Sequence, residues 1–168
     1  MRGPKVPSLF PVILMITETN IKTLAEQKIG GTPLFLVDVK VKPVNKIEVF
    51  VDGPDHLSID DCVSISKHIE AGLNRDVEDF ELTVSSPGID QPFKVMEQYR
   101  KYTGKEVSVL RKDGIKIIGK LANANEEQVE IETKKTERGV KGKGKQTIIE
   151  NITIQLDNIK ETKLILPF

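Results

Sequence analysis

The chain has 168 residues, 38% of them hydrophobic and 30% charged, a composition that is typical of one large or two small globular domains and excludes disorder throughout. Its one cysteine, Cys62, cannot form an internal disulfide, and no cysteine pattern suggests a metal site, so we expect a reducing compartment, the cytosol. The formal net charge of zero hides an asymmetry, because residues 15–92 carry 14 acidic and 7 basic side chains, a balance of −7, whereas residues 93–168 carry 11 acidic and 16 basic ones, a balance of +5.

Residues 1–14 are interpreted as a tail that precedes a natural start at Met15. The short apolar run from Leu9 to Ile16 contains Pro11 and lacks a small-residue cleavage site, which disfavours a secretory signal. It is also far shorter than the roughly 20 apolar residues that span a bilayer. We expect this segment to be an extension or a disordered tail.

The next residues predict a helix followed by a hairpin. Apolar residues recur at helical spacing from Ile21 to Ile29, and Gly30-Gly31 supplies the left-handed end. From Phe35 the period changes to two, with Phe35, Val37, Val39 and Val41 on one face. A turn at Pro43–Asn45 leads into a second alternating strand over Ile47–Val51.

A second helix and a third strand complete the first half. Ser58 and Asp61 form a capping-box pattern ahead of a helix whose apolar face is predicted to contain Ile59, Cys62, Val63, Ser66, Ile69 and Leu73. Phe80, Leu82 and Val84 predict a strand that ends at Pro87-Gly88. The order α-β-β-α-β predicts both helices on one side of a three-stranded sheet. We expect the third strand to be parallel to the second and to lie beside the first.

The second half is predicted to be a small β-barrel. We interpret Phe93–Gly104 as a linker with a single helical turn around Val95–Tyr99. Short apolar stretches then recur at strand spacing, with an Asp113-Gly114 hairpin turn, and they fit an SH3-like or Sm-like barrel. Between two of its strands, Lys134–Lys145 is predicted to be a flexible, basic, glycine-rich loop that contains a weak G-x-x-G match at Gly139–Gly142.

No catalytic or metal site is predicted. Cys62 and His68 could suggest a thiol and its base, but six helical residues rotate them apart by about 240°. The histidines and the nearby Asp55, Asp60 and Asp61 show no recognised ligand spacing. We therefore expect neither a metal nor another cofactor.

One segment carries a family signature. Val84-Ser85-Ser86-Pro87-Gly88-Ile89-Asp90-Gln91-Pro92 by itself predicts a domain-boundary turn, because Pro87-Gly88 ends the strand and Pro92 stiffens the exit. It is also similar to the Ser-Ser-Pro-Gly signature of the ribosome maturation factor RimP family. The resemblance covers nearly the whole chain from Met15, through Val49–Asp52, Leu57–Cys62, Phe80–Gln91, Tyr99, Gly104, Val107, Gly114 and Gly119–Leu121.

The resemblance implies an N-terminal α/β domain, residues 15–92, and a C-terminal SH3-like or Sm-like barrel, residues 93–168. It further implies a non-enzymatic cytoplasmic factor that binds the immature small (30S) ribosomal subunit and assists its maturation. The implied partners are a ribosomal protein near the decoding region and ribosomal RNA, and we expect a monomer.

The opposite charges of the halves suggest that the acidic half contacts a basic ribosomal protein and the basic half contacts RNA. The residues predicted for the ribosomal protein or the domain junction are Asp52, Asp60, Asp61, Ser85, Ser86, Pro87, Gly88 and Gln91. The residues predicted for RNA are Lys94, Arg100, Lys105, Lys134, Lys135, Arg138, Lys141, Lys143 and Lys145. Gln91 stands where the family commonly has arginine, so we place the phosphate contact at Lys94, Arg100 or Lys105 instead.

Two alternatives stay open. A general Sm-like RNA-binding module or chaperone would bind assorted RNAs through the barrel alone as well as through the full chain. A small hydrolase that uses Cys62 or the histidines would lose its function when Cys62 is replaced by alanine.

Overall fold

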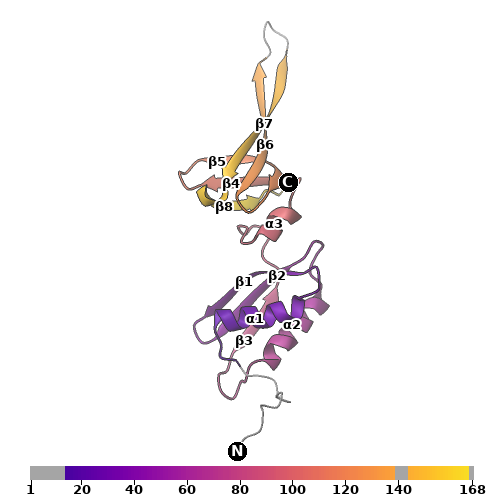
Figure 1. The fold of residues 1–168 in the computed structure, drawn as a ribbon, viewed down its shortest axis with the longest axis vertical. Helices are drawn as coiled ribbons and strands as arrows, with labels where there is room; N and C mark the ends of the chain where they lie inside the picture. Colours follow the sequence, from indigo (N-terminus) through magenta and orange to yellow (C-terminus); the bar gives the residue numbers. More distant parts are fainter. Residues whose placement is uncertain (1–13, 139–143, 167–168) are drawn as a thin grey trace, which may run out of the picture. The chain divides into compact units, whose positions relative to one another are not determined.

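The computed structural model describes residues 14–138 and 144–166, with only the backbone at 136–138, 145 and 146. Its elements in chain order (Figure 1) are α1 Glu18–Ile29, β1 Phe35–Lys42, β2 Lys46–Asp52, α2 Ile59–Ala71, β3 Glu81–Ser85, α3 Met96–Lys101, β4 Glu106–Arg111, β5 Lys116–Ala124, β6 Gln128–Arg138, β7 Lys145–Gln155, the 3-10 turn η2 Leu156–Asn158 and β8 Ile159–Leu164. The chain divides into two compact units, one ending at Pro87 and one beginning at Gly88, which we call the N-terminal and C-terminal domains.

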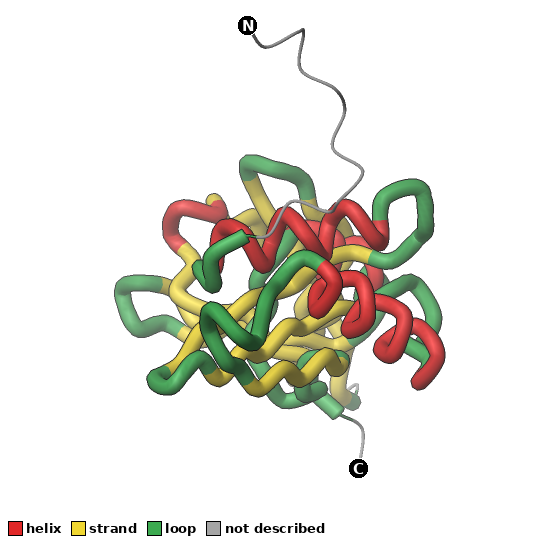
Figure 2. Tube along the Cα trace, turned by 90° about the horizontal axis from the view of Figure 1, so that it is seen from below, coloured by secondary structure: helices red, strands yellow, loops and turns green. Residues whose placement is uncertain are grey.

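The predicted α+β class is confirmed. A three-stranded sheet follows the order β1-β2-β3, and a five-stranded antiparallel, barrel-like sheet follows the order β7-β6-β5-β4-β8. Strand residues, drawn yellow in Figure 2, outnumber helical ones in the described chain. No helix within the described ranges is long and apolar enough to cross a membrane.

The sheet of the N-terminal domain has both long helices on one face (Figure 1), as predicted. β3 is parallel to β2, also as predicted, but the expected position beside β1 is wrong: Ile47 of β2 pairs with Leu82 of β3. The helix positions explain this order. α1 packs over β1, so α2 and the strand that follows it occupy the other side of β2.

A bulge in β1 changes which residues face the core. The β1–β2 register shifts between Leu36 and Asp38. Val39 of β1 belongs to the core cluster, and the partly buried Leu36 and Val41 pack against it. The predicted shared face of Phe35, Val37, Val39 and Val41 holds only in part: Phe35 is half-buried, and Val37, although only 6% exposed, is not part of this cluster. An extra, unpaired residue in a strand reverses which side chains face the core beyond it, so the alternation does not continue through a bulge.

The capping box of α2 is confirmed, but part of its predicted apolar face is wrong. The Asp61 backbone N–H donates to Ser58 Oγ (3.0 Å), and the Ser58 N–H donates to the Asp61 carboxylate (3.3 Å). The helix buries Ile65 and Ile69, whereas Ile59 is 82% and Val63 45% exposed. Ile65 and Ile69 lie one turn apart and set the buried stripe, which Ile59 and Val63 miss.

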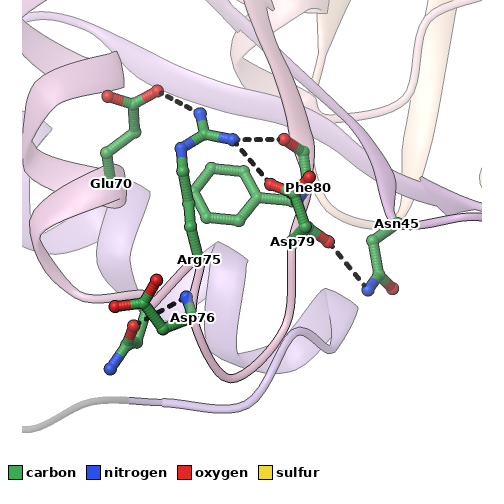
Figure 3. A network of polar contacts seen from close by, with 7 residues as sticks. Asn45, Glu70, Arg75, Asp76, Asp79 and Phe80 are labelled. Carbon is green, nitrogen blue, oxygen red and sulfur yellow. Dashed lines mark hydrogen bonds and ion pairs between the residues drawn. The ribbon is translucent and has the colours of Figure 1, made fainter.

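Arg75 fixes the connection from α2 to β3 (Figure 3). Its guanidinium contacts the carboxylates of Glu70 and Asp79, both at 3.1 Å, and donates to the Phe80 carbonyl oxygen. It also lies 4.0 Å from the centre of the Phe80 ring. Asn45 donates to the Asp79 carbonyl oxygen at 3.1 Å and thereby ties the β1–β2 turn to the same connection.

The start of the described chain belongs to the packed domain. The Leu14 N–H donates to the Gly72 carbonyl oxygen at 2.9 Å, and Leu14 and Ile16 pack against the core of the N-terminal domain. Leu14 is thus part of the fold rather than of the predicted tail. Residues 1–13 lie outside the described residues.

The segment Phe93–Gly104 is not the predicted linker. It contains α3, whose Tyr99 is 8% exposed, and Phe93, Met96 and Tyr102 pack against the same core as Val107, Val109, Leu121, Val129 and Ile131. The segment therefore belongs to the C-terminal domain. Its apolar residues are too few for a helical period to be recognised, but each of the aromatic ones has a large surface to bury.

Candidate functional site

The three predicted acidic contact residues differ in accessibility. Asp52 ends β2 and is only 5% exposed, so it is not an available surface charge. The Asp61 carboxylate is engaged in the capping box of α2. Asp60, in the same first turn, is exposed. Asp61 also stabilises α2 because its negative charge lies at the positive end of the helix dipole. Of the three, Asp60 is therefore the acidic side chain that a basic partner can reach most readily.

The signature segment begins as a strand and continues as a turn. Ser85 ends β3 opposite Phe50, and Ser86 is exposed. The Gln91 N–H donates to the Gly88 carbonyl oxygen at 3.0 Å. A Cβ on Gly88 would lie 2.8 Å from Asp90 Oδ1, the end of an exposed side chain that can move aside. The exposed Gln91 amide is 3.5 Å from Asp90 Oδ1, the outer limit of a hydrogen bond.

The aromatic residues around α3 pack against one another at the edge of the C-terminal core. Phe93 meets Tyr99 edge to face (centroids 5.0 Å apart) and stacks on Tyr102 (5.3 Å, 21° between planes). The hydroxyls of Tyr99 and Thr162 share a buried hydrogen bond of 2.8 Å. Burial raises the pKa of Tyr99, and the bond to Thr162 lowers it by less, so this phenol stays protonated at neutral pH.

Lys94, Arg100 and Lys105, all predicted RNA contacts, are exposed on this rigid segment. Gln98 fixes its start, because the buried side-chain oxygen accepts the backbone N–H of Val95 at 3.1 Å. The cations thus project from a backbone that is anchored to the barrel-like sheet. Because this backbone is already ordered, binding of a ligand to these cations costs less conformational entropy.

Where the structure describes it, the predicted basic loop is part of a two-stranded ribbon, which corrects the sequence interpretation. β6 and β7 pair without a register break from Gln128↔Gln155 to Arg138↔Lys145. The pairing of β5 with β6 extends only to Glu132, so the far part of the ribbon projects beyond the sheet (Figure 1).

Four of the six basic residues predicted for the loop lie on these strands. Lys134 and Lys135 are exposed, whereas Arg138 and Lys145 are described by their backbone alone. Lys141, Lys143 and the G-x-x-G match at Gly139–Gly142 lie outside the described residues.

The ribbon also exposes apolar side chains that the sequence interpretation assigned to the barrel. Ile149, opposite Lys134, is 57% exposed, and Ile148, opposite Lys135, is 36% exposed. Adjacent strand residues face opposite sides, so two neighbouring isoleucines cannot both enter one core. That rule could have identified one of these two exposed positions from the sequence.

The surroundings of Cys62 do not activate a thiol. Burial, and less strongly the charge of Asp61, raise the pKa of Cys62, which is the opposite of what a nucleophilic cysteine needs. His68 Nε2 lies 3.3 Å from the Gln27 side-chain oxygen on α1. Among the described residues no group of three His, Cys, Asp or Glu is placed to hold a metal ion.

Comparison with known proteins gives a consistent result over the length of the chain. The family model "RimP N-terminal domain" matches residues 24–90. The chain is 34% identical over 147 residues to the "Ribosome maturation factor RimP" of Porphyromonas gingivalis strain W83, which covers 88% of this chain and 97% of that protein. It is similar to proteins of the same name from Flavobacterium psychrophilum (32% over 156 residues, 92% and 100% covered) and Christiangramia forsetii (31% over 150 residues, 89% and 97%).

Proposed function

This chain belongs to the RimP family of ribosome maturation factors, and we propose that it is a non-enzymatic cytoplasmic factor that binds the immature small (30S) ribosomal subunit and assists its maturation. The observation that carries the proposal is the opposite charge of the two halves of the chain, −7 over residues 15–92 and +5 over residues 93–168. These halves nearly coincide with the two compact units, which divide between Pro87 and Gly88. A ribosomal precursor offers both basic protein and anionic RNA. Opposite charges on one chain orient it between them.

The RNA contact is assigned to the C-terminal domain. Lys134 and Lys135 on the ribbon, together with Lys94, Arg100 and Lys105, present exposed cations. If about four phosphates are neutralised, log affinity falls with log salt at a slope of roughly −3 to −4. Co-sedimentation of the full chain with precursor small subunits over a salt series measures this slope, and salt-independent association would contradict the RNA contact.

Replacing both ribbon lysines isolates the contribution of the ribbon. Lys134→Gln with Lys135→Gln is expected to flatten the salt slope by about 2, since each phosphate contact contributes about 0.9. The matched control is Lys22→Gln with Lys28→Gln, two exposed lysines on α1, which should leave the slope unchanged. Equal slopes for the two double variants would remove the ribbon from the proposal.

The protein contact is assigned to the N-terminal domain, and Asp60 is its sharpest test. Asp60→Lys is expected to weaken binding to the isolated basic ribosomal protein about 3- to 10-fold, the range for an exposed interfacial charge. Asp76→Lys, an exposed acid on the same domain, is the matched control. Unchanged affinity of the Asp60 variant would argue against this face.

Loss of the chain from cells tests the function as a whole. The proposal predicts an accumulation of free, incompletely processed small subunits. A normal subunit profile in such cells would contradict it, whereas a chain that acted as a general RNA-binding module would affect many RNAs alike.

A further inference from the structure

An open cavity of about 400 Å³ lies in the C-terminal domain, with Lys105 in its lining. Its walls come from the segment after α3, the start of β4 and the end of β8. They consist of Tyr102, Gly104, Lys105, Glu106, Leu164 and Ile165. This volume falls within the range of small-molecule pockets and exceeds what one nucleobase needs.

Backbone hydrogen bonds preform both walls of the cavity. The Gly104 N–H donates to the Leu121 carbonyl oxygen at 2.7 Å, and the Leu121 N–H donates to the Lys105 carbonyl oxygen at 2.9 Å. The opposite wall is held by the Ile165 N–H, which donates to the Glu106 carbonyl oxygen at 2.9 Å. Gly104 has φ +91, and a Cβ there would meet no atom within 4 Å, so the backbone borders open space.

The lining combines a flat apolar surface with separated charges. The half-buried Tyr102 stacks on Phe93, and Lys101 Nζ lies 5.4 Å from the centre of its ring, so a base that enters displaces the end of the Lys101 side chain or lies beside it. Leu164 and Ile165 add aliphatic surface. Aromatic rings and aliphatic side chains receive the π-face of any base. The exposed Lys105 suits a phosphate, while the Glu106 carboxylate accepts hydrogen bonds from the amino or imino edge of a base and repels phosphate.

We propose that this cavity receives one unpaired nucleobase of an RNA strand, with the base against Tyr102 and the adjoining phosphate on Lys105. The inference rests on the proposed function in that the RNA is taken to be ribosomal. It adds a preference for single-stranded segments, because the bases of a duplex are stacked and cannot enter a cavity of this kind. Lys94, Arg100 and the ribbon lysines contact only the backbone and do not supply that preference.

The test compares one RNA in two forms, bound to the full chain. A labelled single strand of about ten nucleotides, and the same strand annealed to its complement, are titrated at fixed salt and followed by fluorescence anisotropy. The single strand should bind more tightly. Tyr102→Leu should weaken single-strand binding about 5- to 30-fold through lost stacking and leave duplex binding within about twofold. Tyr102→Phe, which keeps the ring, is the matched control and should bind as the unaltered chain does.

A second variant keeps the test decisive if Tyr102→Leu does not fold, as judged by circular dichroism. Ile165→Ala removes aliphatic surface from the cavity, adds no aromatic ring, leaves the Phe93–Tyr102 stack untouched, and should also weaken single-strand binding. Equal affinity of the unaltered chain for single strand and duplex, or unchanged single-strand affinity of the folded variants, would overturn the inference.

Two further outcomes separate this inference from the proposed function. If Tyr102→Leu weakened binding to a small-subunit ribosomal protein but not to RNA, the cavity would hold a protein side chain and the inference would be wrong. If the variants bound single strands normally while the unaltered chain still co-sedimented with precursor small subunits, the cavity assignment alone would fail. Absence of co-sedimentation would instead refute the proposed function.

Discussion

The hydrogen bond between Tyr99 and Thr162 predicts how strongly α3 is fixed to the C-terminal domain. The two hydroxyls are 2.8 Å apart, and the residues are 8% and 1% exposed, so water does not replace a lost partner easily. Tyr99→Phe and Thr162→Val each remove one hydroxyl with little change of volume. Each leaves the other hydroxyl buried without this partner.

The expected magnitude follows from that geometry. A buried polar group that loses its partner destabilises a protein by about 1–3 kcal/mol, whereas removal of both groups together is much milder. Each single variant should therefore lower the free energy of unfolding by about 1–3 kcal/mol. The double variant should lose clearly less than the sum, with a coupling of about 1–2 kcal/mol.

Tyrosine fluorescence makes this measurement specific to one domain. The chain has no tryptophan and two tyrosines, Tyr99 and Tyr102, both in the C-terminal domain. Urea unfolding of the full chain followed at this signal reports that domain alone, and Tyr102 remains as the probe in Tyr99→Phe. Strictly additive losses, or single losses below about 0.5 kcal/mol, would refute the reasoning.

Three further predictions concern the turn, the sheet and the pH. Val44 is 96% exposed and has φ 64, a left-handed backbone conformation that strains valine and suits asparagine. Val44→Asn should therefore stabilise the N-terminal domain by about 1 kcal/mol in thermal unfolding followed by circular dichroism, and a lower unfolding midpoint would contradict this strain. A Cβ on Gly119 would lie 2.5 Å from the Glu132 carbonyl oxygen, so Gly119→Ala should lower the free energy of unfolding in urea by about 1–3 kcal/mol. The control Lys120→Ala should change it little, and equal unfolding midpoints for the two variants would exclude the clash. Burial raises the pKa of Tyr99, so its contribution to the stability of the C-terminal domain should be complete below about pH 10 and should be lost as the pH rises through the folded pKa. Tyrosinate absorbance measures the ionisation. The part of the stability loss that accompanies it should disappear in Tyr99→Phe.

Much of the fold could be predicted because local patterns and tertiary structure agree. The alternation of Val107 with Val109 and of Val129 with Ile131 gives buried strand residues, all 0% exposed. The order of the N-terminal strands was not predictable in the same way. It depends on which helix packs over which strand, and the sequence pattern of β3 is equally compatible with either neighbour.

The candidate site was predicted less well, because exposure depends on tertiary context. The charge asymmetry and the exposed Lys134 and Lys135 could be read from the sequence. The burial of Asp52 and the cavity beside Tyr102 could not, since both arise where segments distant in sequence meet. Glycine-rich composition favoured a loop at Lys134–Lys145, whereas the β-branched residues of β7 favour a paired strand.

The unbroken pairing of β6 with β7 makes the reach of the projecting ribbon adjustable. A matched pair of residues inserted into the two strands would move the tip outward by roughly 3.3 Å per residue and leave the barrel-like sheet untouched. Each such step also turns every side chain beyond it to the opposite face. Even-numbered insertions before Lys134 therefore extend the ribbon and keep Lys134 and Lys135 on their present faces, whereas odd-numbered ones exchange the faces of the two lysines.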